Sequence, residues 1–275
     1  MKSEILRLLK ESDGYVSGQQ LCERFQVSRT AVWKVVDQLK KEGYEIEAVP
    51  RKGYRLVESP DVLSEAELES LRSTKWAGKS IFVFKETDST NIQAKAPMLT
   101  LVMALAVARA IREQTGAEAL IKWPNDIVVQ GRKICGILTE MSTEMTWINY
   151  VVIGIGINVN QNEFPEELKD CASSLKMETG RRFRRSHLIA AVMEHFEMYY
   201  EQFLQEGSLA GFRKEYNELL VNKDRQVKIL EPGNHYEAYA LGIDDTGELI
   251  VEKEDGSVQN IFAGEVSVRG IYGYT

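Results

Sequence analysis

The first 25 residues carry a hydrophobic pattern that predicts two short helices. Apolar residues recur at helical spacing within Lys2–Lys10 and predict the first helix. Ser17, with Gln20 three residues later as a capping-box partner, predicts the start of a second helix that ends near Phe25.

A third helix is predicted after a turn at Gln26-Val27. Ser28 is its expected N-cap, and the helix reaches Glu42 because Gly43 is a natural C-terminal stop. Its apolar stripe is expected to be buried and comprises Ala31, Val32, Val35, Val36 and Leu39. Two short strands, over residues 44–49 and 54–56, follow around the turn Pro50-Arg51-Lys52-Gly53.

Three helices followed by a basic-tipped hairpin are typical of a winged helix-turn-helix, whose third helix fits the major groove of DNA. The candidate DNA-binding residues are polar, basic or aromatic: Gln19, Ser28, Arg29, Thr30, Trp33, Lys34, Arg51 and Lys52. The alternative is a protein-interaction module with a solvated charged face, and Trp33 taken alone is more typical of a core residue than of a base contact. The Ser-Arg-Thr start of the third helix and the Arg51-Lys52 pair favour DNA.

The central part of the chain predicts strands interrupted by one long helix. After a linker at Ser59-Pro60, a strand over Ile81–Phe84 leads to the helix start Thr87-Asp88-Ser89-Thr90-Asn91. The long helix is expected over Pro97 to Gln114 and ends at Gly116. Further strands are expected over Leu120–Trp123, Lys133–Thr139 and Tyr150–Asn158, with a turn at Pro124-Asn125-Asp126.

Gly154 and Gly156 fall on one face of the last of these strands. Glycines at alternate positions of a strand remove side chains and let a ligand lie close to the backbone. A Gly-x-Gly pair within a strand, rather than at the start of a helix, does not indicate a dinucleotide fold.

The last fifty residues predict a small all-β domain. Five short strands with turns at Asp245-Thr246-Gly247 and Asp255-Gly256 indicate an SH3-like barrel. The expected strands are Gln226–Leu230, Tyr236–Ile243, Leu249–Glu252, Val258–Phe262 and Val266–Val268.

Charge and cysteine content refine this organisation. The chain has 275 residues and a net charge of −7, but residues 1–58 hold eleven Lys and Arg against nine Asp and Glu, so the remainder carries −9. The three cysteines, Cys22, Cys135 and Cys171, show no metal-ligand spacing and suit a reducing cytoplasm. The longest apolar run, Leu101–Ala108, is too short to span a membrane, so a cytoplasmic protein is expected.

Four segments together resemble the bifunctional biotin protein ligases that also repress the biotin operon. They are residues 87–91 (Thr-Asp-Ser-Thr-Asn), 122–126 (Lys-Trp-Pro-Asn-Asp), 131–138 (Gly-Arg-Lys-Ile-Cys-Gly-Ile-Leu) and 154–159 (Gly-Ile-Gly-Ile-Asn-Val). The resemblance implies an α+β multidomain fold: a winged helix-turn-helix over 1–60, a class II aminoacyl-tRNA-synthetase-like catalytic domain over 61–221, and an SH3-like β-barrel over 222–275.

The resemblance also implies chemistry and partners. Biotin and ATP form biotinyl-adenylate, and a lysine of the biotin carboxyl carrier domain of acetyl-CoA carboxylase then receives the biotinyl group. Mg²⁺ is an implied cofactor, operator DNA an implied partner, and the liganded protein an implied homodimer.

The implied roles fall on three sets of residues. Lys133, with Asp126 and Asn125, is implied to be catalytic; Asp126 orients the reactive amine or a magnesium ion. Asn125, Asp126 and Asn158 lie on the nucleotide side. Biotin is implied to contact Lys133 and the residues Ser89, Thr90, Asn91, Gly154 and Gly156. The stretch Ala263–Ser267 resembles a part that leans on the nucleotide.

One segment of the family is absent from this sequence. Members carry several dozen residues, including the loop Gly-Arg-Gly-Arg-x-Gly-Arg-x-Trp and two strands, between the Ser-Thr-Asn helix and the long helix; here Lys95 is followed by Ala96-Pro97. The run Arg181–Arg185 lacks the glycines and is interpreted as a solvated lead into a helix capped by Ser186. The missing loop is implied to clamp biotin and shield the adenylate from water.

Two alternatives remain. The first is a DNA-binding repressor whose ligase domain is inactive because the loop is missing; the retained Lys133, Asn125 and Asp126 count against it. The second, a lipoate ligase on the same kind of fold, fits poorly because the helix-turn-helix belongs to biotin enzymes.

Overall fold

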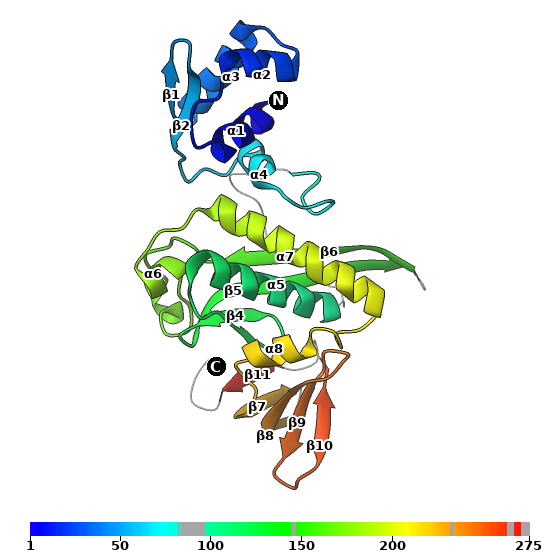
Figure 1. The fold of residues 1–275 in the computed structure, drawn as a ribbon. Helices are drawn as coiled ribbons and strands as arrows, with labels where there is room; N and C mark the ends of the chain where they lie inside the picture. The colour runs from blue at the N-terminus through cyan, green and yellow to red at the C-terminus, as the bar shows by residue number, and fades with distance from the viewer. Residues whose placement is uncertain (82, 84–96, 145–146, 232–233, 263–266, 271–275) are drawn as a thin grey trace. The chain divides into compact units, whose positions relative to one another are not determined.

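A computed structural model describes residues 1–81, 83, 97–144, 147–231, 234–262 and 267–270, and the chain divides into two compact units (Figure 1). The first unit comprises residues 1–86 and 184–190, and the second comprises residues 87–183 and 191–275. The bounds of the three domains expected from the sequence remain predictions.

The first unit contains the expected winged helix-turn-helix. Its elements are α1 (Lys2–Glu11), α2 (Gly18–Phe25), α3 (Arg29–Lys41), the antiparallel strands β1 (Glu45–Val49) and β2 (Gly53–Glu58), and α4 (Glu65–Leu71). The caps are local: the Ser28 hydroxyl accepts from the Ala31 N–H, and the Ser17 hydroxyl accepts from the N–H of Gln19 rather than of Gln20 as expected.

The apolar faces of these helices form the core of the first unit. It is built around Ile5, Leu6, Leu9, Leu21, Val32, Val36 and Leu39. The expected stripe of α3 is confirmed except at Ala31, which is only half-buried. The idea that Trp33 packs in the core is wrong, because this side chain is 56% exposed on the opposite face.

A buried carboxylate joins α4 to the rest of the first unit. Glu67 is fully buried and accepts hydrogen bonds from the hydroxyls of Tyr44 (2.5 Å) and Ser186 (3.2 Å), while the Lys10 Nζ lies 2.7 Å from its Oε2. Ser186 is therefore inside its helix, α7 (Arg185–Glu206), and the prediction that it caps the helix is wrong. The Arg185 N–H donates instead to the Asp61 carboxylate at 3.1 Å.

The second unit is built on an antiparallel sheet of four described strands in the order β3-β4-β5-β6. They are β3 (Leu120–Lys122), β4 (Asp126–Val129), β5 (Arg132–Glu144) and β6 (Trp147–Ile157). The strand β4 is not predicted from the sequence, where Asp126 is expected in a turn, and β5 and β6 extend closer to each other along the chain than expected. Of the expected strand at 81–84, Ile81 and Val83 lie in no strand, and residues 82 and 84 lie outside the described part.

One face of this sheet is covered by α5 (Pro97–Thr115), the expected long helix, which is buried on nearly all sides between Leu101 and Ile111. The Thr100 hydroxyl donates to the Thr139 hydroxyl of β5 at 2.8 Å. Helix α7 runs beside α5, where His195 and Glu113 are in contact at 2.7 Å (Figure 1). The remaining helices are short: a 3-10 turn (Glu166–Leu168), α6 (Leu175–Thr179) and α8 (Arg213–Leu219).

The C-terminal strands form an all-antiparallel five-stranded sheet in the order β10-β9-β8-β7-β11, close to the expected spans. They are β7 (Arg225–Glu231), β8 (Asn234–Ile243), β9 (Leu249–Lys253), β10 (Val258–Ile261) and β11 (Ser267–Gly270). The turn at Gly247 packs against the helical layer: its carbonyl accepts from the buried Trp123 indole at 3.0 Å, and an added Cβ would lie 2.8 Å from Leu101. Trp123 is therefore a structural residue that ties the last domain to the sheet.

Candidate active site and nucleic-acid interface

An ion pair lies on the face of the four-stranded sheet opposite α5, called here the open face. The Lys133 Nζ on β5 lies 2.5 Å from Oδ1 of Asp126 on β4, and the Lys122 Nζ lies 3.8 Å from Oδ2. The Lys133 side chain is 38% exposed, whereas that of Asp126 is only 9% exposed. A buried carboxylate thus holds an accessible ammonium at a fixed position on the sheet.

A β-bulge explains why Lys133 points to this face. Ile127 pairs with Cys135 and Val128 pairs with Lys133, so Ile134 is an extra residue in β5. Without the bulge, Lys133 and Gly136 would lie on opposite faces, since side chains alternate along a strand. An added Cβ on Gly136 would lie 3.0 Å from both Cε and Nζ of Lys133, which shows that the lysine lies over this glycine.

Glycines leave part of the sheet face beside the ion pair without side chains. Gly136 pairs with Gly156 across β5 and β6, and Leu138 pairs with Gly154, so these residues share one face. Leu138 is 40% exposed, whereas Ile137 beside it is buried. The result is a flat, partly apolar surface with one ammonium group at its end, which suits an elongated apolar ligand that carries an anionic group.

The polar residues around Lys133 are fixed by backbone contacts. The Asn125 side-chain amide donates to the Ile137 carbonyl at 3.0 Å, and its own backbone carbonyl accepts from the Ile137 N–H at 2.8 Å. The Asn158 N–H donates to the Ile134 carbonyl at 2.8 Å. The structure thus brings Asn125, Asp126, Lys133 and Asn158 together at one end of the sheet, whereas Ser89, Thr90 and Asn91 lie outside the described residues, as do residues 263–266.

The donors at this site fit an ammonium better than a divalent cation. Both carboxylate oxygens of Asp126 face lysine ammonium groups. Among the described residues, no cluster of three His, Cys, Asp or Glu side chains could hold a metal ion. In the structure Asp126 positions the Lys133 ammonium, and its roles toward the reactive amine or a magnesium ion stay predictions.

Cys135 lies on the opposite face and takes no part in this chemistry. Burial raises the pKa of its thiol far above the ordinary value, and the Asp126 carboxylate raises it further. The thiol therefore stays protonated and is a poor nucleophile.

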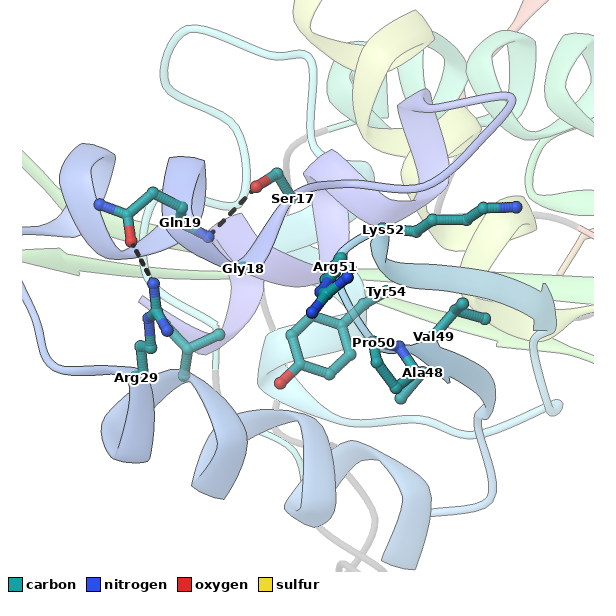
Figure 2. Close-up of a pocket in the computed structure, with 12 residues that line it drawn as sticks. Ser17, Gly18, Gln19, Arg29, Ala48, Val49, Pro50, Arg51, Lys52 and Tyr54 are labelled. Atoms are coloured by element: carbon teal, nitrogen blue, oxygen red, sulfur yellow. Dashed lines mark hydrogen bonds between the residues drawn. The ribbon is translucent and has the colours of Figure 1, made fainter.

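In the first unit, Arg29 at the start of α3 is oriented by α2. Its guanidinium donates to the Gln19 side-chain oxygen at 3.0 Å (Figure 2). The Gln19 amide in turn donates to Glu23 at 2.8 Å. Arg29, Thr30, Trp33 and Lys34 are all exposed on α3.

The wing presents its two basic tip residues differently. Arg51, at φ +64°, and Lys52 both line a cavity of about 500 Å³ with Arg29, but the Lys52 side chain extends away from Arg29 (Figure 2). The Lys52 Nζ lies 5.7 Å from the ring centre of Tyr15, which also contacts Arg55 at 5.1 Å. A basic groove thus opens between the two helix starts and the wing.

Comparisons with known proteins match each part of the chain. Residues 2–55 match the HTH domain family, residues 73–158 the biotin/lipoate A/B protein ligase family, and residues 224–269 the biotin protein ligase C terminal domain. The bifunctional ligase/repressor BirA of Bacillus subtilis (strain 168) is 33% identical, with 98% of both chains covered. The chain belongs to the bifunctional biotin ligase/repressor family.

More distant relatives agree with this placement. The Escherichia coli (strain K12) bifunctional ligase/repressor BirA is 26% identical, with 97% of this chain and 96% of that protein covered. The apo structure of biotin protein ligase from Aquifex aeolicus is 32% identical and superposes with a TM-score of 0.58 over 63% of this chain and 75% of that one. The fold of the catalytic part is thus that of a biotin protein ligase, and the relatives do not favour the lipoate alternative.

The alignment with the Bacillus relative also bears on the missing segment. It runs over 323 positions, but 98% of this 275-residue chain is only about 270 residues. This ligase/repressor therefore has no residue at about 53 of the aligned positions. That number agrees with a missing segment of several dozen residues.

Two residues at the sheet site were not recognised from the sequence. Gly136 makes room for Lys133, and Lys122 places a second ammonium beside Asp126. The pairing of Gly136 with Gly156 would have indicated the site, but this pairing is known only once the register of β5 against β6 is known.

Among the described residues, no helix is both long and apolar enough to cross a membrane.

Proposed function

We propose that the open face of the sheet activates the carboxylate of biotin with ATP. A carboxylate oxygen attacks the α-phosphorus, the bond to the β-phosphate oxygen breaks, and pyrophosphate leaves. The amine nitrogen of an acceptor lysine then attacks the carbonyl carbon, the carbonyl–oxygen bond to AMP breaks, and the amine loses a proton. The observation that carries the proposal is the Lys133 ammonium held 2.5 Å from the buried Asp126 carboxylate above Gly136.

Lys133 is suited to both steps. Each step places negative charge on oxygens that were less charged before, and a fixed ammonium stabilises such charge without having to reorganise. Asp126 acts by positioning Lys133. Gly154 and Gly156 let the hydrocarbon part of biotin lie against β6, and Asn125 and Asn158 lie toward the nucleotide. Ser89, Thr90 and Asn91 supply hydroxyl and amide groups for the ureido ring.

The partners follow from the same proposal. The acceptor is the biotin carboxyl carrier domain of acetyl-CoA carboxylase, and Mg²⁺ enters with the phosphates of ATP. The winged helix-turn-helix represses the biotin operon by binding operator DNA through Gln19, Ser28, Arg29, Thr30, Trp33, Lys34, Arg51 and Lys52. The adenylate-bound protein forms a homodimer along the β6 edge, where Tyr150 and Val152 are exposed, and it works in the cytoplasm.

A second function is favoured by the roughly 53 aligned positions at which this chain has no residue. Without the arginine- and glycine-rich loop, water reaches the adenylate and hydrolyses its mixed anhydride. The chain would then act chiefly as a repressor whose ligase domain transfers little biotin.

One experiment separates the two functions. The 275-residue chain is incubated with biotin, ATP, Mg²⁺ and a purified carrier domain, and mass spectrometry follows free biotinyl-adenylate and biotinylated carrier. Adenylate in solution with little labelled carrier supports an intact activating site without a closing loop. Abundant labelled carrier shows that the loop is dispensable. Neither product, together with intact DNA binding, shows that the chain is a repressor without ligase activity.

A further inference from the structure

Trp33 is the one large hydrophobic side chain of α3 that is exposed. It is 56% exposed in the middle of α3, while the nearby apolar residues Val32 and Val35 are buried. An exposed indole makes no contribution to the core of this module. Its position is therefore best explained by a contact that forms only when the outer face of α3 is covered.

The neighbours of Trp33 define the chemistry of whatever covers it. Arg29 and Thr30 precede it by one helical turn, and Lys34 follows it, so all three share or border its face. The acidic residue one turn later, Asp37, is already paired with Lys41 at 2.7 Å. An apolar protein groove would prefer apolar neighbours, whereas this surface joins one aromatic ring to two cations and suits a polyanion with apolar features.

Duplex DNA has one such feature in its major groove. Thymine presents a C5-methyl group there, and the other bases present only hydrogen-bonding groups. An indole ring offers a flat apolar surface and a single N–H donor, so its preferred contact in the groove is this methyl group. The Gln19 contact meanwhile holds Arg29 at the start of the helix, one turn away from Trp33.

We infer that Trp33 is a specificity-determining residue that reads thymine through its methyl group in the major groove. The inference rests on the proposed operator binding and goes beyond it by naming the chemical group that is read. Trp33 contributes sequence preference, while the neighbouring cations contribute affinity for phosphate that does not depend on sequence.

The test begins with selection of duplexes from a random-sequence pool by the full chain, with biotin, ATP and Mg²⁺ present. Trp33→Ala and the control Gln38→Ala, an exposed position on another face of α3, are selected in parallel. The wild type and the control are expected to enrich the same sequence, with thymine fixed at one or more positions. Trp33→Ala is expected to lose that thymine preference while keeping the salt dependence of its binding, because no phosphate contact is removed.

A second measurement addresses the methyl group directly. Uracil replaces the fixed thymine in the selected duplex, which removes only the methyl group. The wild type is expected to bind about three- to fivefold more weakly per methyl lost, and Trp33→Ala is expected to bind both duplexes equally. An unchanged thymine preference in Trp33→Ala would overturn the inference about Trp33 but not the proposed operator binding. An equal loss of affinity for the uracil duplex in both proteins would do the same. Failure of the wild type to enrich any sequence would overturn the operator binding on which it rests.

Discussion

Lys133 on β5 and Arg29 on α3 are both accessible cations with a polar partner, but their partners differ. Lys133 faces a carboxylate that is only 9% exposed, whereas Arg29 faces the neutral, exposed Gln19. A buried charged partner fixes the position of the ammonium and makes the site dependent on that partner. A neutral surface partner orients the guanidinium and leaves its charge available to a phosphate or a base. Substitutions at the sheet site should therefore change stability and exchange, whereas substitutions on α3 should change the salt dependence of DNA binding.

The largest expected effect concerns the absent segment. Insertion of the loop-and-strand segment of a family member between Lys95 and Pro97 is expected to raise biotin transfer to a carrier domain at least about a hundredfold, because the loop excludes water from the adenylate. The thermal midpoint of the second unit should rise as well, because the added strands bury apolar surface. Carrier labelling and calorimetry measure the two effects. An insertion variant that folds more stably but transfers no more biotin would contradict the assigned role of the loop.

The next effect tests the buried partner of the sheet site. Asp126→Asn should lower the free energy of unfolding by about 3–5 kcal/mol, because two lysines lose a shared carboxylate in a poorly solvated place. Pyrophosphate exchange should fall by about two orders of magnitude, since Lys133 is no longer held in position. Urea unfolding and exchange assays provide the measurements.

The control for Asp126→Asn is Glu166→Gln, which removes an ion pair with Lys169 in which both side chains are exposed. It should change stability by less than about 1 kcal/mol and leave exchange unaltered. Equally small effects of both substitutions on stability and exchange would show that Asp126 has no role in the site.

The first unit also depends on a buried carboxylate, that of Glu67. Glu67→Gln should destabilise this unit by about 3–5 kcal/mol, because Lys10 and Tyr44 lose a buried charged partner. Burial lowers the pKa of Lys10 while Glu67 raises it, so removal of the carboxylate leaves the cost of burial uncompensated. Glu42→Gln removes the more exposed pair with Lys2 and should cost less than about 1 kcal/mol. Urea-dependent hydrogen exchange of the amides of the first unit measures both, and a reversed order would refute the role of Glu67.

The smallest expected effects lie on the exposed face of α3. Arg29→Ala and Lys34→Ala should each reduce the slope of log K against log salt by about one unit, because one phosphate contact is lost. Stability should change by no more than about 0.5 kcal/mol. Fluorescence anisotropy with a selected duplex measures the slope. Lys41→Ala, at the far end of the helix, is the control and should leave the slope unchanged; an unchanged slope in all three variants would remove Arg29 and Lys34 from the interface.

The features that sequence predicted well depend on local signals. Ser17 and Ser28 cap their helices through contacts within three residues, and the C-terminal strands are separated by turn residues such as Gly247 and Gly256. These signals do not require knowledge of distant parts of the chain.

The features that sequence missed depend on long-range pairing. The short strand β4 follows a Pro-Asn-Asp motif that resembles a turn, and only its pairing with β3 and β5 makes it a strand. The bulge that turns Lys133 over Gly136 is a property of that register. Ser186 was expected to cap a helix because its local sequence fits, whereas Glu67, far away in the chain, explains its burial.

The most direct test of the account is biotin-dependent exchange of labelled pyrophosphate into ATP by the 275-residue chain and by Lys133→Ala. The wild type is expected to catalyse exchange even if little biotin reaches a carrier. The variant should be about 10²–10³-fold slower, because the developing charge loses about 3–4 kcal/mol of stabilisation, while circular dichroism and DNA binding stay the same. Equal exchange by both proteins would contradict the assignment of Lys133, and absence of exchange in the wild type would contradict the activating site itself.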